Sequence, residues 1–266
     1  MNIFDFSLNV PMDAGVASRH YYPEGHVEVR QDKVLKEHVL NVYINNQLAA
    51  RLVCTPVHLT ELVLGRLLTE GCIASADDVS KITLSHGAER INVELTDECA
   101  DAVKSRISRF SCMAKTFSLN ENSQIELKAV TPLPWDASQI FHAVKMFEDD
   151  SPIHKITNCV HSCYLFENDS VKYCCEDIGR HNAFDKVVGC ALCDGVDLRN
   201  TFVFTSGRVP LDMVTKAIRA GIPMLVSKAA PTEQTVQMAQ TYGLTLVGLA
   251  HADSFCVYTN MPIMQV

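Results

Sequence analysis

Apolar strand-like runs alternate with helical stretches in the second half of the chain, and this alternation is the strongest constraint on its fold. Buried strands are predicted over 201–205, 223–227 and 244–249, with helical stretches between them. Strands that alternate with helices of about 10–15 residues are typical of βα units on a parallel sheet. We therefore expect an α/β domain with a mixed, largely parallel sheet. The other elements predicted here are strands over 161–166, 171–175 and 255–258, and helices over 180–193, 211–220 and 231–242.

The first half predicts a smaller α+β unit. Strands over 38–44 and 48–54 flank Asn45-Asn46, a pair typical of a tight hairpin turn. A helical stripe of leucine and valine follows from His58 and ends at Gly71. The remaining elements predicted in this half are strands over 81–84 and 90–95 and a helix over 96–107.

A proline-rich stretch separates the two halves. Residues 131–135 carry two prolines, which disfavour both helix and central strand. Asp136 is placed to cap a helix that runs to about residue 147. The predicted segments are an N-terminal arm over 1–27, a small α+β domain over 28–110, a loop and linker over 111–134, and the α/β domain over 135–266.

Composition and charge exclude several classes of protein. Of the 266 residues, 47% are hydrophobic and 20% are charged, which is typical of a folded, soluble chain. No apolar run approaches the roughly 18 residues of a membrane helix, and the start of the chain lacks the features of a signal peptide. A net charge of -8 disfavours general nucleic-acid binding. Eleven cysteines, an odd number, favour free thiols in a reducing cytoplasm.

Polar residues cluster after three of the predicted strands. In a parallel sheet the carboxyl ends of the strands share one edge, where α/β proteins bind ligands. Glycine lets a ligand approach the backbone, and arginine and lysine suit phosphate groups. The carboxylate and amide groups can hydrogen-bond a sugar or a base. The candidate binding residues are Asp177, Gly179, Arg180, His181, Asn182 and Asp185 in the first cluster, Ser206, Gly207 and Arg208 in the second, and Ser227 and Lys228 in the third.

Cys112 is the candidate reactive thiol. It lies in a predicted loop between Arg109 and Lys115. Nearby cations lower a thiol pKa below its usual ~8.5 and favour the thiolate, which is the nucleophilic form. The alternative is an incidental exposed cysteine.

Other cysteines carry weaker signals. His161 lies near Cys163, Cys174 and Cys175 in the sequence, and these residue types bind zinc. Adjacent cysteines in a strand point to opposite faces, which disfavours a zinc site. Cys190-Ala191-Leu192-Cys193 matches a C-x-x-C pattern, but its place late in a predicted helix favours core packing over redox chemistry.

The run from Glu176 to Lys186 closely resembles the signature of the FdhD proteins, the accessory sulfurtransferases of formate dehydrogenase. The resemblance covers about residues 28–259 and includes 205–208 and 227–232. It implies a small N-terminal α+β domain and a cytidine-deaminase-like α/β domain, in a cytoplasmic protein that is usually a homodimer.

The same resemblance implies a function. A cysteine desulfurase supplies sulfur as a persulfide on a loop cysteine, here Cys112. The sulfur then passes to the molybdenum (or tungsten) bis(guanine dinucleotide) cofactor before that cofactor enters formate dehydrogenase. This cofactor is a bound substrate, and no permanently bound metal is expected. Family analogy adds a set of cofactor-binding residues: Leu249, Ala250, His251, Ala252, Asp253, Ser254 and His161.

Three sites depart from the family pattern. Lys115 stands where a second loop cysteine is usual, so any resolving role of that thiol is lost. Asn158 and Cys159 replace two glycines, which bears on close backbone approach and adds a thiol near the site. His251 replaces an arginine, which predicts a weaker or pH-sensitive contact.

The working hypothesis is a sulfurtransferase in which Cys112 accepts sulfane sulfur and delivers it to the predicted sheet edge. His161 or His181 can assist proton transfer, although a binding role is preferred for both. One alternative is a non-catalytic protein that binds and protects the cofactor. Another is a zinc hydrolase of the deaminase type, whose Pro-Cys-x-x-Cys signature is absent from the sequence.

Overall fold

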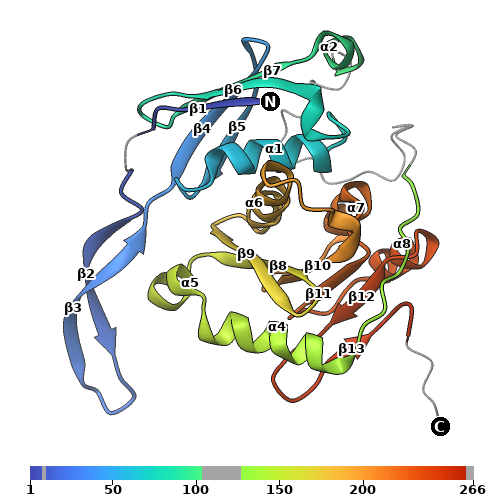
Figure 1. The fold of residues 1–266 in the computed structure, drawn as a ribbon. Coiled ribbons are helices and arrows are strands. Elements are labelled where there is room, and N and C mark those ends of the chain that lie inside the picture. Colours follow the sequence, from blue (N-terminus) through green and yellow to red (C-terminus); the bar gives the residue numbers. More distant parts are fainter. Residues whose placement is uncertain (8–9, 104–126, 262–266) are drawn as a thin grey trace.

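The computed structural model describes residues 1–7, 10–103 and 127–261 of the chain. Two sheets and a separate hairpin contain the strands, and helices lie between and around the sheets (Figure 1). The predictions made for Cys112 and Lys115 concern residues outside this described part. None of the described helices is long and apolar enough to cross a membrane.

The first sheet has five strands in the order β1-β6-β7-β4-β5 and belongs to the N-terminal unit, residues 1–103. β4 and β5 join through Asn45 and Asn46, whose φ angles of 47° and 63° are those that a tight hairpin turn requires. The predicted hairpin, the helix α1 and the second strand pair are confirmed. The elements are β1 (Asn2–Asp5), β4 (His38–Ile44), β5 (Gln47–Cys54), α1 (Leu59–Thr69), β6 (Val79–Leu84), β7 (Arg90–Leu95) and α2 (Asp97–Val103).

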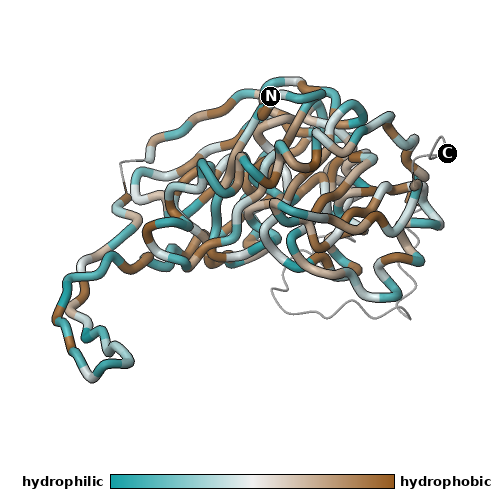
Figure 2. Tube along the Cα trace, turned by 90° about the horizontal axis from the view of Figure 1, so that it is seen from below, coloured by the Kyte–Doolittle hydropathy of each residue, from teal (hydrophilic) through white to brown (hydrophobic). Residues whose placement is uncertain are grey.

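A two-stranded hairpin projects from the body of the molecule (Figures 1 and 2). It consists of β2 (Asp13–Tyr21) and β3 (Val27–Leu35). The sequence, in which no periodicity was evident before residue 25, did not reveal β1 or β2. Both faces of the hairpin are largely exposed, so its strands lack the apolar alternation by which a half-buried strand is recognised.

The second sheet belongs to the C-terminal unit, residues 127–261, and has the order β13-β12-β11-β10-β8-β9. β10, β11 and β12 are parallel neighbours, and β8 and β13 pair antiparallel with them. β9 and β10 both run antiparallel to β8, so β9 points the same way as the parallel strands. The predicted mixed α/β fold is therefore confirmed. The elements are α4 (Ala137–Asp149), α5 (Pro152–Thr157), β8 (His161–Glu167), β9 (Ser170–Asp177), α6 (Arg180–Cys193), β10 (Thr201–Thr205), α7 (Leu211–Ala220), β11 (Met224–Ser227), α8 (Glu233–Thr241), β12 (Thr245–Gly248) and β13 (Cys256–Val257).

Successive side chains of the second sheet point to its two faces and belong to two apolar clusters, one on each face. On β8, Cys163 and Leu165 join a cluster that includes α1, α6 and α7, whereas Tyr164 and Phe166 pack with α4. Helices α6 and α7 thus lie between the two sheets, and α4 covers the opposite face (Figure 1). Because the first cluster contains residues of both sheets, the two units share one hydrophobic core.

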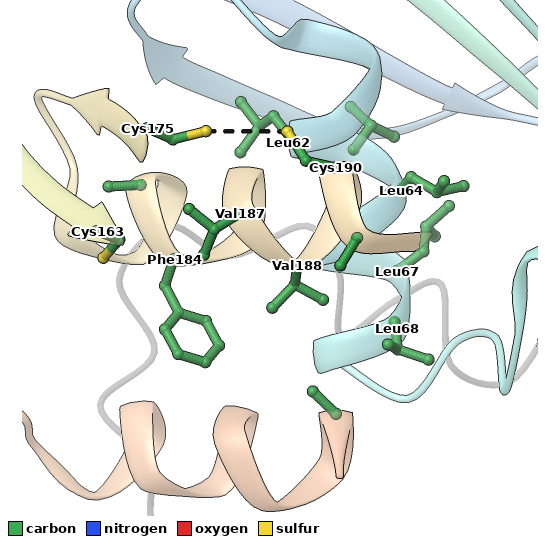
Figure 3. Close-up of a cluster of buried hydrophobic side chains, with 14 of the residues drawn as sticks. Leu62, Leu64, Leu67, Leu68, Cys163, Cys175, Phe184, Val187, Val188 and Cys190 are labelled. Atoms are coloured by element: carbon green, nitrogen blue, oxygen red, sulfur yellow. Dashed lines mark hydrogen bonds between the residues drawn. The ribbon is translucent and has the colours of Figure 1, made fainter. Parts of the chain in front are cut away.

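Two glycines bring α1 and α6 into direct backbone contact. A Cβ added at Gly65 would lie 1.8 Å from Asp185 O, and a Cβ added at Gly189 would lie 1.8 Å from Glu61 O. Leucine and valine side chains of both helices fill the space beside this crossing (Figure 3). The N-terminal unit is therefore docked on α6, the helix that begins within the signature motif.

Candidate functional site

The strand-end clusters predicted from the sequence meet at one edge of the second sheet. The carboxyl ends of β9, β10, β11 and β12 lie there with the amino end of β8, where His161 pairs opposite Asp177. The N–H of Ser162 donates to Ser206 Oγ at 2.9 Å, and the N–H of Ser206 donates to Ser162 O at 3.0 Å. These bonds hold the loop after β10 against the start of β8.

The loops after β10, β11 and β12 are also bonded to one another. Ser227 Oγ donates to Gly207 O at 2.9 Å, and the N–H of Ala250 donates to Ser227 O at 3.0 Å. The N–H of Lys228 donates to Thr205 O at 3.3 Å. The predicted binding residues of these three loops are therefore neighbours in the structure.

Cationic side chains surround His161 at this edge. A Cβ added at Gly207 would lie 3.0 Å from Arg180 Cβ and 3.3 Å from His161 Nδ1, so these residues are in contact. Burial is the main cause that lowers the pKa of His161. The charges of Arg180 and Arg208 lower this pKa further, and the neighbouring imidazoles of His154 and His181 act in the same direction when they carry a proton. A histidine kept neutral among cations marks a region of positive potential, which suits an anion.

Arg180, the first residue of α6, has an unsatisfied donor. Its Nε is buried and finds no hydrogen-bond partner among the residues that the structure describes. A buried donor without a partner costs about 1–3 kcal/mol, which an oxygen of a bound anion would recover. The N–H groups and the positive dipole end of α6 lie at the same place. The arrangement fits a phosphate group.

His181 is held in place by an acid on the next helix. Its Nε2 lies 2.8 Å from Asp212 Oδ2 on α7. Burial acts to raise the pKa of Asp212, but the hydrogen bond and charge of His181 outweigh burial and leave that pKa below its usual value. Asp212 is therefore ionised at neutral pH and orients the imidazole of His181.

Residues 249–254, which follow β12, form a turn at this edge of the second sheet. Leu249 adopts a φ of 51°, and the N–H of His251 donates to Ser254 O at 2.8 Å, which closes a turn. Ala250 is fully buried. The exposed residues of the turn are His251, Ala252, Asp253 and Ser254.

Lys228 and Arg208 contribute differently to the charge of the edge. Arg208 is exposed. Lys228 Nζ lies 4.8 Å from the centre of the Phe147 ring and 3.8 Å from Glu148 Oε1, so part of its charge is balanced. Arg208 is thus the more available of the two cations for a ligand.

Three residues predicted to bind a ligand are instead buried in the contact between the units. Asp177 has no exposed surface and pairs with Lys186 Nζ at 2.6 Å. Its carboxylate also accepts the N–H of Thr55 at 3.0 Å and the N–H of Gly179 at 2.9 Å. The carboxylate of Asp177 is thus fully buried and engaged by the lysine and by these N–H groups, which is a structural role.

Asn182 and Asp185 lie on the face of α6 that meets the N-terminal unit. Asn182 Nδ2 donates to Val53 O at 2.8 Å, and a Cβ at Gly179 would crowd this amide at 3.0 Å. Asp185 has no exposed surface; it accepts Thr69 Oγ1 at 2.7 Å and pairs with Lys216 Nζ at 2.9 Å. The expected contact of Asp185 with a ligand is corrected, because the carboxylate lies inside the docked interface.

Sequence reasoning missed a residue that positions the edge. Glu176 is only 5% exposed and accepts the N–H groups of Ile153 and His154 at 2.8 and 3.0 Å. It also accepts Ser162 Oγ at 3.1 Å. Glu176 thus anchors α5 and brings His154 to the edge. The six residues of α5 are too few for a periodic signal; Pro152 at its start was the available hint.

The two positions without the family's glycines are tolerated in different ways. Asn158 has a φ of 49°, a left-handed conformation that asparagine accepts more readily than most residues. Cys159 is exposed at the turn into β8, two residues before His161.

The cysteines weighed as zinc ligands do not converge. Cys175 packs with the cluster of α6 and Cys174 with that of α4, on opposite faces of β9 as predicted. Among the described residues, no group of three or more metal-binding side chains is placed to hold an ion.

Comparison with known proteins decides the family. A sequence model of the FdhD/NarQ family matches residues 35–264. The chain belongs to the FdhD/NarQ family.

Relatives in this family match nearly the whole chain. The sulfur carrier protein FdhD of Bacillus pumilus is 30% identical over 91% of this chain and 94% of its own length. The protein of the same name from Bacillus subtilis is 30% identical over 90% of this chain and 93% of its own length. A crystal structure of a protein provisionally assigned as a formate dehydrogenase accessory protein, from Desulfotalea psychrophila, superposes with a TM-score of 0.74 at 28% identity; it covers 95% of this chain and 98% of that one.

Proposed function

We propose that this protein carries sulfur as a persulfide on Cys112 and transfers it to the molybdenum or tungsten bis(guanine dinucleotide) cofactor used by formate dehydrogenase. The names of the FdhD relatives support the general role of sulfur carrier and accessory protein. The cation cluster around His161 is the observation that carries the substrate assignment, because this cofactor is strongly anionic. A cysteine desulfurase is the proposed donor, and a cytoplasmic homodimer is the proposed state.

The described residues fit the phosphates of such a substrate. Arg180 offers the unpartnered Nε, and Arg208 is an exposed cation close enough to act on His161. Neutral His161 donates a hydrogen bond from one ring nitrogen. Guanine N–H groups need acceptors, and the exposed Asp253 is available for them, whereas the carboxylate of Asp177 is occupied within the protein.

Loading of sulfur exchanges one S–S bond for another. The thiolate of Cys112 attacks the terminal sulfur of the desulfurase persulfide, the donor's S–S bond breaks, and the donor cysteine leaves as a thiolate. Cys112 then holds the sulfane sulfur and presents it to the substrate at the sheet edge.

Sulfur loading tests the proposal directly. The protein is incubated with a cysteine desulfurase and radiolabelled cysteine, and persulfides are mapped by mass spectrometry. Label is expected on Cys112, absent in Cys112→Ala, and kept in Cys256→Ala, a control at an exposed thiol of β13. Persulfide on other cysteines, together with activation of formate dehydrogenase by Cys112→Ala, would overturn the carrier assignment.

A non-catalytic cofactor-binding protein is the second candidate, and Lys115 in place of the second loop cysteine favours it. It predicts normal activation of formate dehydrogenase by Cys112→Ala. It also predicts binding of guanosine diphosphate (GDP), a mimic of half the substrate, that this variant leaves unchanged.

A further inference from the structure

The projecting hairpin of β2 and β3 exposes apolar side chains on one of its faces (Figures 1 and 2). Tyr21 pairs opposite Val27, and Val29 follows on the same face because side chains alternate along a strand. Tyr21 and Val29 are 73% and 71% exposed, and Val27 is 46% exposed. A two-stranded hairpin is at best marginally stable in water, and three or more strands with an apolar face give independent stability. Further strands from another chain would therefore stabilise this hairpin.

The opposite face of the hairpin carries a polar network. Asp32 accepts a hydrogen bond from Ser18 Oγ at 2.5 Å and lies 2.7 Å from His20 Nε2, which ties β3 to β2. Arg30 Nη2 donates to Glu28 Oε2 at 2.5 Å. The network holds the two strands together and places a cation, Arg30, and an acid, Asp32, two residues apart on β3.

The outer edge of β3 presents backbone groups for pairing, because β3 is an edge strand of a two-stranded sheet. At the two ends of the hairpin, the N–H of Tyr22 donates to His26 O at 3.0 Å and the N–H of Lys36 donates to Met12 O at 2.7 Å. Hydrogen-bonded pairs alternate along an antiparallel ladder, so the even-numbered residues of β3 bond to β2. The odd-numbered residues turn their N–H and C=O groups outward: Val27, Val29, Gln31, Lys33 and Leu35.

A second copy of β3 complements this edge in charge and in shape. When two β3 strands pair antiparallel about Gln31, this residue lies opposite itself as a hydrogen-bonded pair, because its N–H and C=O point outward. Arg30 of each copy then lies opposite Asp32 of the other, in a non-hydrogen-bonded pair, where side chains come closest. Val27 lies opposite Leu35 of the second copy, which extends the apolar face.

The outer edge of β2 does not complement itself in this way. Its outward backbone groups also belong to odd-numbered residues, so the matching two-fold axis would pass through Ala17. Arg19 would then lie opposite Gly15, and Tyr21 would lie opposite Asp13. Neither pair joins opposite charges, so charge complementarity selects the edge of β3.

We propose that this protein dimerises through its hairpins, with β3 of one copy paired antiparallel to β3 of a second copy. The four strands form one sheet in the order β2-β3-β3-β2, with the apolar side chains on one face. The contact is isologous, as a two-fold dimer requires. A specific interface takes about 20–30 residues from each partner, and the hairpin supplies nine from each strand besides its turn. The inference assigns a surface to the proposed homodimer and is independent of sulfur transfer.

Sedimentation of the full-length protein tests the assembly, with proline as the probe. We expect a dimer for the unchanged protein. Gln31→Pro removes an N–H that β2 does not use, so the hairpin is kept while each dimer loses two hydrogen bonds at its axis. The dissociation constant should rise about 100-fold or more. Ala17→Pro is the matched control, because Ala17 pairs opposite Gln31 and turns its N–H to the other edge; it should leave the dimer unchanged. Melting curves show that each variant is folded.

Cross-linking tests the register of the two strands. The Cα atoms of a hydrogen-bonded antiparallel pair lie about 5.5 Å apart, within the ~4.4–6.8 Å that a disulfide spans. On mild oxidation, Gln31→Cys should form a disulfide between two copies, identified by mass spectrometry, and Ala17→Cys should not. A disulfide in Ala17→Cys instead would overturn the choice of β3.

Three results would overturn the dimer itself. One is a monomer in sedimentation of the unchanged protein, and another is a dimer that Gln31→Pro leaves unchanged. The third is a hairpin covered by a different protein, such as a cysteine desulfurase, in place of a second copy. None of these measurements involves sulfur loading, so a failure here and a failure of Cys112 to carry sulfur are told apart.

Discussion

The ion pair between Lys186 and Asp177 offers a sharp test of how the two units are held together. Nζ and Oδ2 lie 2.6 Å apart, and neither side chain has exposed surface. Lys186 Nζ also donates to Thr55 Oγ1 at 2.6 Å, which ties the pair to the N-terminal unit. Lys186→Met keeps an unbranched side chain but leaves the carboxylate of Asp177 buried without its cation.

Removing one partner of a buried ion pair costs about 3–5 kcal/mol, because the remaining charge is left uncompensated. Asp177 would keep hydrogen bonds from Thr55, Gly179 and Asn182, so we expect the lower end, about 3 kcal/mol. At about 2–4 °C per kcal/mol for a chain of this size, the melting temperature should fall by about 6–12 °C.

Lys145 and Asp149 provide a matched control. Their charged atoms are also 2.6 Å apart, but the side chains are 73% and 59% exposed. Lys145→Met should leave the melting temperature and the urea midpoint unchanged within error, because water and salt screen such pairs. Adding Asp177→Asn to Lys186→Met should recover part of the loss, since no buried charge then remains. Equal, small effects of both lysine substitutions would refute the reasoning.

Three further predictions concern the interface and the edge. Gly189→Ala should lower the melting temperature, because the new methyl group would clash with Glu61 O and force α6 away from α1, at a cost of about 2 kcal/mol or more. Gly87→Ala is the control and should leave the melting temperature unchanged, because its methyl group would meet no atom closer than 3.9 Å. Arg180→Met should weaken GDP binding about 10-fold or more in calorimetry, because it removes a charged hydrogen bond; unchanged affinity would contradict the site. Because the pKa of His161 is lowered in the folded protein, the imidazole binds a proton at a higher pH in the unfolded chain than in the folded one. The contribution of His161 to the free energy of unfolding is therefore fully present above about pH 6.5 and is lost as the pH falls through the folded-state pKa. His161→Gln should therefore lose less stability than the unchanged protein between about pH 7.5 and about pH 5.

Elements with strong periodicity and turn residues were predictable from the sequence. β4, β5 and α1 follow this rule, with Asn45 at a turn and Gly71, at a φ of 73°, after a helix end. The hairpin of β2 and β3 was not predictable, because it is exposed on both faces. At the sheet edge, the residue types in the sequence indicated a group of cationic side chains. Which side chains of α6 point to the edge and which point to the N-terminal unit depends on how α6 packs against α1, and this was not predictable. No local pattern distinguishes a carboxylate that meets a ligand from Asp185, which meets a buried lysine of another helix.

The density of polar residues in the signature motif follows from its position between an edge and an interface. Asn182, Asp185 and Gly189 recur at spacings of three and four residues, so they share the face of α6 that packs on the N-terminal unit. Arg180 starts the same helix at the open sheet edge. Asp177 connects the two regions, because one carboxylate accepts the N–H of Thr55 from the other unit and the N–H of Gly179 at the start of α6. The contact that docks the units therefore also fixes the first turn of α6, and the cationic edge keeps its geometry only while the units stay docked.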